Sequence, residues 1–284
     1  MKIFAKTLLA CSAVTCLLVT SVASAITYNP FTFKPLKSDA FIADKITGNY
    51  VEVATFDAVK KTFDVSLFWN AGQFVTDNGQ TALDASDTGL GYDFRMYGLY
   101  HAAGTFAISG PKTTLSFKPG SGRLQIYVDN GVGTGANGHK TDLVHYTKPT
   151  SGTGDFVFAR SSDDILIEDG FPLSGVGTLD TSLSTCGVGK GINCGSFGST
   201  TEFALTVAGK SYFSGPKTFY DTSFQSGQLN NFETTGTQTI NGALDLTFAN
   251  VALVPASSVP EPATTVLFGL GLLGVSLTRL RKKS

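Results

Sequence analysis

The fold is decided by residues 50–69, which begin Tyr50-Val51-Glu52-Val53-Ala54-Thr55-Phe56 and, after a break at Lys60-Lys61, continue Thr62-Phe63-Asp64-Val65-Ser66-Leu67-Phe68-Trp69. In both halves bulky side chains alternate with polar or small ones, which is the period of a half-buried β-strand rather than of a helix. Two such segments with a short break between them predict a β-hairpin that turns around the two lysines.

The same alternation recurs along the chain. The further predicted strands are Tyr92 to His101, Thr113 to Phe117, Arg123 to Asp129, Asp155 to Arg160, Asp164 to Glu168, Thr201 to Ala208, Ser211 to Phe213 and Ala243 to Ala249. Turn signals rich in Gly, Asn and Pro separate them, at residues 77–79, 119–122, 129–131, 151–154 and 241–242. The pattern of residues 218–230 is ambiguous, because it does not establish whether this segment is an amphipathic helix. About ten short strands with such turns predict an all-β fold, an antiparallel β-sandwich of the jelly-roll kind.

The N-terminus predicts a secretory signal peptide over residues 1–25. Lys2 and Lys6 give a positive start, and residues 7–20 are uncharged and mostly apolar. Ala23 and Ala25 then supply the small-x-small pattern of a cleavage site. We therefore expect these 25 residues to be removed when the chain is exported.

The C-terminus contains three elements in series. Val259-Pro260-Glu261-Pro262 interrupts regular structure, because each proline ring fixes φ and removes a backbone donor. The uncharged segment 263–278 would span about 24 Å as a helix, at the short edge of what crosses a hydrocarbon core. We expect a single transmembrane helix over residues 263–280. The basic tail consists of Arg279, Arg281, Lys282 and Lys283.

This tail resembles a PEP-CTERM sorting signal; an ordinary C-terminal membrane anchor or a buried core helix is the alternative interpretation. The resemblance rests on the Pro-Glu-Pro triplet, an apolar segment interrupted by Gly269, Gly271 and Gly274, and the arginine-rich end, in that order. It implies an exported protein of a Gram-negative bacterium that makes exopolysaccharide. It also implies an intermediate tethered to the inner membrane, processing near the triplet by an exosortase, and final placement at the cell surface or in the extracellular matrix. The chain then divides into signal peptide 1–25, exported domain 26–255 and sorting signal 256–284.

Charge and composition restrict the function of the exported part. Residues 26–259 hold 15 Lys and Arg against 21 Asp and Glu, a net charge of about −6. Because nucleic-acid binding needs a basic surface, we expect no nucleic-acid partner. The chain has 32 Gly, 22 Phe and only 15% charged residues, which is typical of a β-rich extracellular protein.

Two cysteines remain after the signal peptide is removed. Cys186 and Cys194 bracket a glycine-rich loop. In an oxidising compartment they most simply form one disulfide, which contributes about 2–3 kcal/mol for a loop this short. A metal site or a reactive thiol is the alternative, although no further metal ligand is close by in the sequence.

Motifs of catalysis are absent from the sequence. His101, His139 and His145 have no HExxH or HxH spacing, and there is no Gly-x-Ser-x-Gly elbow. The glycine-rich run at 131–138 lacks the lysine spacing of a phosphate loop. We expect no catalytic residue and no cofactor.

Acidic residues gather at two places. Asp84 and Asp87 lie in a glycine-containing segment, and Asp163 and Asp164 precede a predicted strand. Such groups are candidate Ca²⁺ ligands, because Ca²⁺ takes six to eight oxygens, often from loop carboxylates. Neither place matches the twelve-residue calcium loop, and solvated turn carboxylates are the alternative.

Further segments resemble the flocculation-associated PEP-CTERM family. They are residues 41–46, 91–97, 122–129, 195–197 and 211–213, in this order over most of the exported part. The resemblance implies a surface protein that promotes cell aggregation together with exopolysaccharide. It brings no catalytic residues.

Two functions therefore stand as hypotheses. The first is a non-enzymatic matrix or adhesion protein, on which Tyr97, Tyr100 and Tyr127 would stack against sugars if exposed; core or cross-strand packing is the alternative for each. The second is a secreted β-sandwich hydrolase acting on polysaccharide, with paired carboxylates as its catalytic groups. The missing catalytic motifs favour the first.

Overall fold

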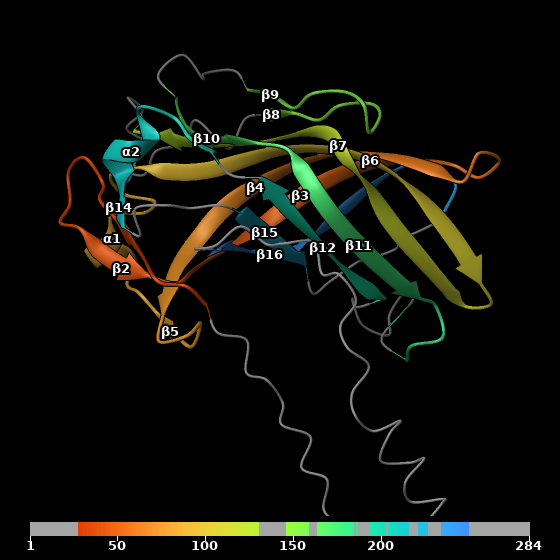
Figure 1. Ribbon diagram of the computed structural model, residues 1–284, viewed down its shortest axis with the longest axis horizontal. Coiled ribbons are helices and arrows are strands. Elements are labelled where there is room, and N and C mark those ends of the chain that lie inside the picture. The colour runs from red at the N-terminus through yellow and green to blue at the C-terminus, as the bar shows by residue number, and fades with distance from the viewer. Residues whose placement is uncertain are drawn as a thin grey trace, which may run out of the picture.

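The structure, a computed structural model shown in Figure 1, describes residues 28–130, 146–158, 164–184, 186, 194–202, 204–215, 221–226 and 234–249. The predicted signal peptide with Ala23 and Ala25, the sorting motif at 259–262, the predicted transmembrane helix 263–280 and the basic tail lie outside the described residues. Within the described ranges, no helix has the length and apolar character needed to cross a membrane.

The predicted hairpin is confirmed. Strand β3 (Lys45–Asp57) pairs antiparallel with β4 (Thr62–Thr76), so that Tyr50 lies opposite Trp69 and Phe56 opposite Phe63. At the turn, Asp57 Oδ1 accepts hydrogen bonds from the backbone N–H groups of Val59 and Lys60, at 3.0 and 2.9 Å.

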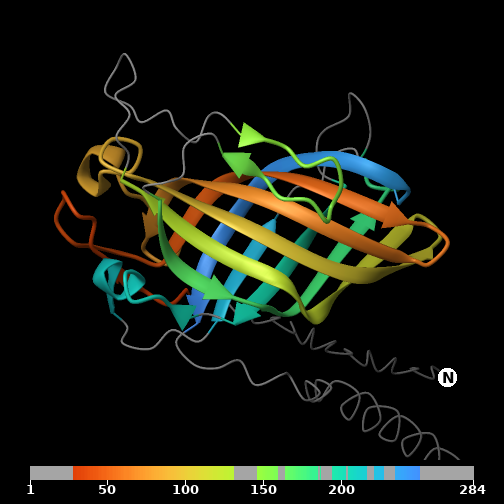
Figure 2. The same cartoon turned by 90° about the horizontal axis from the view of Figure 1, so that it is seen from above.

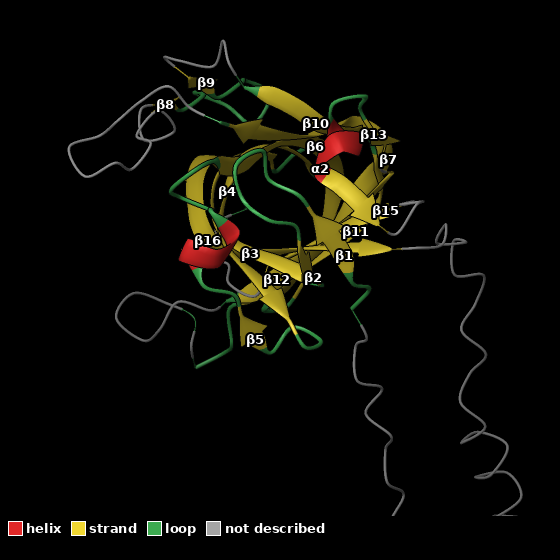
Figure 3. Ribbon diagram, turned by 90° about the vertical axis from the view of Figure 1, so that its left-hand side faces the viewer, coloured by secondary structure: helices red, strands yellow, loops and turns green. Residues whose placement is uncertain are grey.

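Eight described strands pair side by side in one antiparallel sheet that closes on itself. After β3 and β4 come β6 (Arg95–Ser109), β7 (Lys112–Asp129), β11 (Pro172–Asp180), β12 (Gly195–Glu202), β15 (Asp221–Ser226) and β16 (Gly236–Ala249). Each of these strands pairs with the next, and β16 pairs with β3 to complete the ring. Figures 2 and 3 show the strands running obliquely around a common axis.

Two short strands extend this ring. Strand β10 (Ile165–Gly170) directly precedes β11 and pairs with the second half of β7, whereas β11 pairs with the first half. Strand β13 (Ala204–Leu205) follows β12 and pairs with β10. The long strand β7 therefore pairs with β6 along one side and with β11 and then β10 along the other.

The expected all-β, antiparallel fold is confirmed, but the expected sandwich is wrong in one respect. A sandwich has two separate sheets, whereas the main sheet here is continuous through the β7–β11 and β16–β3 pairings. Alternation of inward and outward side chains is the same in both architectures, so the sequence pattern does not distinguish them.

The structure answers the ambiguity at residues 218–230 in part, and it corrects the turn expected at residues 119–122. The ambiguous segment contains strand β15 and no helix among its described residues, 221–226. The predicted turn at Pro119–Gly122 lies inside β7, where the pairing with β6 shifts between Ala102 and Gly104. Gly122 has φ of 105°, a conformation that few other residues adopt, so this segment forms a bulge rather than the end of a strand.

One end of the closed sheet is covered by a small three-stranded sheet, at the left of Figure 1. It consists of β1 (Phe31–Phe33), β2 (Phe41–Ala43) and β14 (Phe213–Gly215), beside the short elements β5 (Thr81–Ala82), α1 (Ala85–Thr88) and α2 (Gly209–Tyr212). Phe31 packs against Phe248 of β16 with ring centroids 4.8 Å apart, and Phe33 packs against Phe74 of β4 at 5.2 Å. Aromatic packing thus joins the small sheet to the large one.

Long side chains cross the interior. The Trp69 indole extends from β4 past Gly48 of β3 and donates a hydrogen bond to the Leu244 carbonyl of β16, at 3.1 Å. The Tyr100 hydroxyl of β6 donates to Ser199 Oγ of β12, at 2.8 Å. Because these side chains connect strands that are not neighbours, the interior is a packed core.

A short hairpin crosses the outer face, and we call residues 146–158 the strap. Its strands β8 (Tyr146–Thr147) and β9 (Val157–Phe158) pair with each other. The rings of Tyr146, Phe156 and Phe158 pack on Phe68, with centroids 4.9 to 5.9 Å away. In Figure 2 the strap lies above the strands of the large sheet.

The predicted disulfide is present. Cys186 and Cys194 are joined, with Cα atoms 4.4 Å apart, in the connection between β11 and β12. Around it, the Asp180 N–H donates to the Cys194 carbonyl at 2.7 Å.

Gly48 provides a test of the core. An alanine Cβ there would lie 2.3 Å from the Asn70 carbonyl oxygen and 2.4 Å from Trp69 Nε1. We expect Gly48→Ala to lower the free energy of unfolding by about 2–3 kcal/mol, because the indole must leave its position and its hydrogen bond. Trp69 is the single tryptophan of the chain, so fluorescence during urea unfolding measures the change directly.

Gly72→Ala is the matched control. In this variant the nearest atom to the new Cβ is the Thr47 carbonyl oxygen, 3.6 Å away. The free energy of unfolding should change by less than about 1 kcal/mol. Equal losses in the two variants would contradict the role of Gly48.

Candidate functional site

The structure does not assemble the predicted calcium ligands. Asp84 and Asp87 lie at the start of α1, whereas Asp164 Oδ2 accepts a hydrogen bond from the Tyr97 hydroxyl at 2.5 Å. Asp163 lies outside the described residues. Across the part of the chain that the structure describes, no group of three or more His, Cys, Asp and Glu residues is suited to a metal ion.

The three tyrosines considered for sugar stacking belong to the packing of the sheet. Tyr97 and Tyr100 are each only 2% exposed. Tyr127 is half-buried and stacks on Tyr97, with ring centroids 5.0 Å apart. Burial raises the pKa of the Tyr97 and Tyr127 hydroxyls, and the hydrogen bond to Asp164 raises the pKa of Tyr97 further. These rings are cross-strand and core pairs, as the alternative interpretation held.

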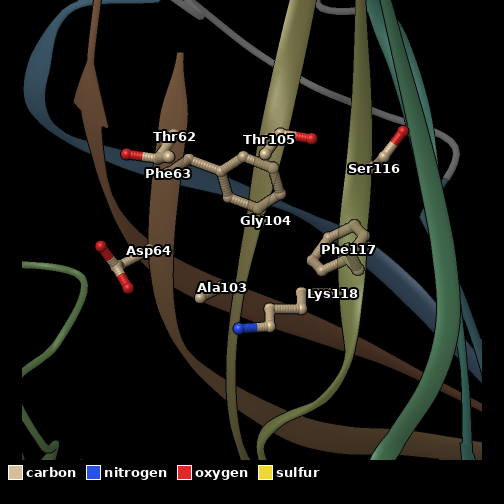
Figure 4. A pocket seen from close by; sticks show the side chains of 9 residues that line it. All are labelled: Thr62, Phe63, Asp64, Ala103, Gly104, Thr105, Ser116, Phe117 and Lys118. Carbon is tan, nitrogen blue, oxygen red and sulfur yellow. The ribbon is translucent and has the colours of Figure 1, made fainter. Parts of the chain in front are cut away.

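A hollow of about 610 Å³ lies on β4, β6 and β7, and we call it the bulge groove (Figure 4). It is lined by Thr62, Phe63, Asp64, Ala103, Gly104, Thr105, Ser116, Phe117 and Lys118. The β7 bulge borders it, and the single Ser121 O–H closes that bulge by donating to one of two carbonyl oxygens within reach, that of Ala103 at 2.9 Å or that of Lys118 at 2.5 Å. Small side chains at Ala103 and Gly104 leave the space open.

The bulge groove presents hydroxyl groups and both charges. Thr62, Thr105 and Ser116 lie opposite one another on three neighbouring strands, which places their hydroxyls in one row. Asp64 and Lys118 lie on either side of Ala103 in Figure 4, and neither forms an ion pair within the described residues. Such a surface accepts and donates hydrogen bonds without a net charge, which suits a polyhydroxylated ligand.

A second hollow, the strap groove, lies between the strap and the outer face of β3 and β16. Its volume is about 630 Å³, and its lining residues are Val51, Tyr146, Thr147, Lys148, Thr239 and Asn241. The Lys148 ammonium donates a hydrogen bond to Thr239 Oγ1 at 3.2 Å, which holds it at the edge of the hollow. Most of the lining groups are polar, and the single charge is positive.

Two side-chain contacts connect the elements around these grooves. Arg123 of β7 donates to Asp169 of β10, with Nε 2.6 Å from Oδ1, and this hydrogen bond lowers the pKa of Asp169 and raises that of Arg123. His101 Nε2 lies 3.0 Å from Asp155 Oδ1 and links β6 to the strap.

Glu52 is the unusual titratable group of the interior. It is 6% exposed, points inward from β3, and has no ion-pair partner within the described part of the chain. Burial alone raises the pKa of Glu52 to about 8. Its carboxyl is therefore largely protonated at neutral pH.

Sequence reasoning missed both grooves, because each is built from segments far apart in the chain. Asp64 and Lys118 come together through the β4–β6–β7 pairing, and Val51, Lys148 and Thr239 through the β3–β16 pairing and the strap. The Pro119–Gly122 segment was the available signal for the first groove, since a bulge accounts for it as well as a turn.

The comparison with known proteins identifies the tail. Residues 258–282 match the family model described as the PEP-CTERM protein-sorting motif. The motif defines the class, an exported protein sorted by an exosortase, with membrane-anchored processing in a Gram-negative bacterium. The predicted sorting residues, Val259 to Pro262, fall inside the match. No curated protein and no solved structure matches the chain.

Glu52→Gln tests the buried carboxyl. Between its ordinary pKa near 4.5 and about pH 8 the unfolded chain loses this proton while the folded chain keeps it, so stability falls as the pH rises. The glutamine variant lacks this loss. We expect the difference in free energy of unfolding between Glu52→Gln and the unchanged protein to grow in favour of the variant from pH 5 to pH 8, and to reach a few kcal/mol. Urea unfolding at several pH values measures it.

Asp57→Asn is the control for this pH series. Asp57 is part of an exposed turn, and hydrogen bonds from the Lys60 backbone lower its pKa. It is ionised in both states above pH 5, so its replacement should give a difference that does not change between pH 5 and 8. A pH-independent effect of Glu52→Gln would show that Glu52 is not buried in its neutral form.

Proposed function

We propose that this protein acts at the cell surface or in the extracellular matrix, where it promotes cell aggregation (flocculation) together with exopolysaccharide, as a binding protein and not as an enzyme. The observation that carries the proposal is the sorting motif at residues 258–282 on a chain whose described domain is a closed all-β sheet. In this proposal, export and sorting by the exosortase bring the domain to the cell surface or the extracellular matrix, where the exopolysaccharide lies.

The outer face supports a binding role. The bulge groove offers a row of hydroxyls with one carboxylate and one ammonium, and the strap groove offers hydroxyls, an amide and an ammonium. Sugars present many hydroxyls that both donate and accept hydrogen bonds, so these are complementary groups.

The paired carboxylates that a hydrolase would use have other contacts. Asp164 accepts a hydrogen bond from Tyr97 and Asp169 accepts one from Arg123, in contacts that hold strands together.

The resemblance of residues 41–46 and 122–129 to flocculation-associated proteins also supports the proposal. These segments lie in β2, β3 and β7.

The sorting step predicts a defined mature chain. We expect mass spectrometry of the protein recovered from the cell surface to show a start at Ile26 and an end near Pro262, because the signal peptide and the apolar segment are both removed. Replacing Glu261 by alanine should retain the longer chain in the membrane fraction. Recovery of surface protein that still carries residues 263–284 would contradict processing.

Gene deletion tests the cellular role. We expect the deletion strain to lose flocculation while it still secretes polysaccharide of unchanged chain length, because the protein connects cells to the polysaccharide and does not modify it. Sedimentation of the cells and sizing of the polysaccharide measure the two effects, and re-expression of the intact gene is the control.

The same strain and the purified protein separate binding from hydrolysis. Polysaccharide of greater chain length in the deletion strain, together with steady release of reducing ends by the mature protein, would replace the proposal by a hydrolase. Normal flocculation in the deletion strain would refute it.

A further inference from the structure

The strap groove differs from the bulge groove in its charge. The bulge groove has Asp64 beside Lys118, whereas the strap groove has Lys148 and no acidic residue in its lining. Asp245 lies on the same strand as Asn241, but its carboxylate is 3.1 Å from the Lys45 ammonium. Asp155, on the strap, is paired with His101. Among the described residues that line the strap groove, Lys148 is therefore the one with a charged side chain.

The groove is also held in place before any ligand arrives. The Gly152 N–H of the strap donates to Thr55 Oγ1 of β3 at 2.9 Å, and the Tyr146 ring packs on Phe68 at 4.9 Å. Thr239 Oγ1 accepts a hydrogen bond from the Lys148 ammonium, which carries three N–H donors and has no other hydrogen bond or ion pair to the part of the chain that the structure describes. A site with fixed walls loses less conformational entropy on binding.

From these observations we propose that the strap groove binds an acidic sugar of a polysaccharide, with the sugar carboxylate on Lys148. The hydroxyls of Thr147 and Thr239 serve the sugar hydroxyls, and Val51 and Tyr146 supply an apolar wall. The volume of about 630 Å³ lies within the range of about 300–1,000 Å³ typical of small-molecule sites, so a short oligosaccharide segment fits. The inference rests on the proposed function and adds the chemical class of the glycan.

A matched pair of probes tests the charge preference. One probe is an oligogalacturonate, and the other is the same oligosaccharide with its carboxyl groups methyl-esterified, which keeps the sugar rings and removes the charge. We expect calorimetry with the mature protein to show binding of the acid about tenfold tighter than of the ester, because hydrogen bonds to charged groups are stronger. The affinity for the acid should fall between 20 and 500 mM salt, whereas the affinity for the ester should not.

Two lysine variants locate the site. Lys148→Gln should weaken binding of the acid about tenfold and leave binding of the ester unchanged. Lys37→Gln removes one ammonium from an exposed position that lines neither groove, and should change neither affinity. Unfolding in urea confirms that both variants fold, which we expect because both side chains are exposed.

The outcomes separate this inference from the proposed function. Equal affinity for acid and ester, or equal effects of the two lysine variants, overturns the acidic-sugar site. Absence of binding to either probe overturns it as well. In each of these cases the deletion strain still decides whether the protein promotes flocculation.

Discussion

The hydrogen-bonded pairing of β16 with β3 is the constraint on which the rest of the structure depends. Eleven residue pairs, from Gly236 opposite Phe56 to Leu246 opposite Ile46, join the last strand of the domain to its first long strand. Without them the sheet would have two long open edges, which are sites of unwanted pairing with other chains. With them, one face of the sheet becomes an enclosed core and the other becomes a continuous outer surface that is free to carry grooves.

The inner and outer faces of the sheet have different roles. Aromatic rings fill both ends of the interior, and Trp69 and Tyr100 connect strands across its middle. The strap adds a second, smaller apolar cluster outside the sheet, around Phe68 and Phe156. This outer cluster fixes the strap without closing off the polar surface beside it. The bulge groove lies where side chains are small, and the strap groove lies between the strap and the outer face of β3 and β16.

Local patterns predicted the strands and the tail well, and long-range arrangement poorly. The alternation around Lys60-Lys61 gave the hairpin, and the triplet at Pro260 gave the sorting motif, because each signal is contained in a few adjacent residues. The sheet closes because β16 pairs with β3, which lies almost 200 residues earlier in the chain. The alternation of side chains along a strand does not indicate which other strand it pairs with. Asn241-Gly242 illustrates the limit: the dipeptide is typical of a turn, yet it lies within β16 opposite Val51 and Tyr50, where pairing overrides the local preference.

The position of β16 in the chain has a consequence for the order of events at the membrane. An exported chain emerges with its N-terminal end first, so β16 is the last strand of the described ring to become available for pairing with β3. Only residues 250–257 separate β16 from the matched motif, and eight extended residues reach at most about 29 Å. The strand that closes the sheet and the sorting motif are therefore separated by a few nanometres of chain at most, so the folded domain stands directly beside the segment that the exosortase must reach.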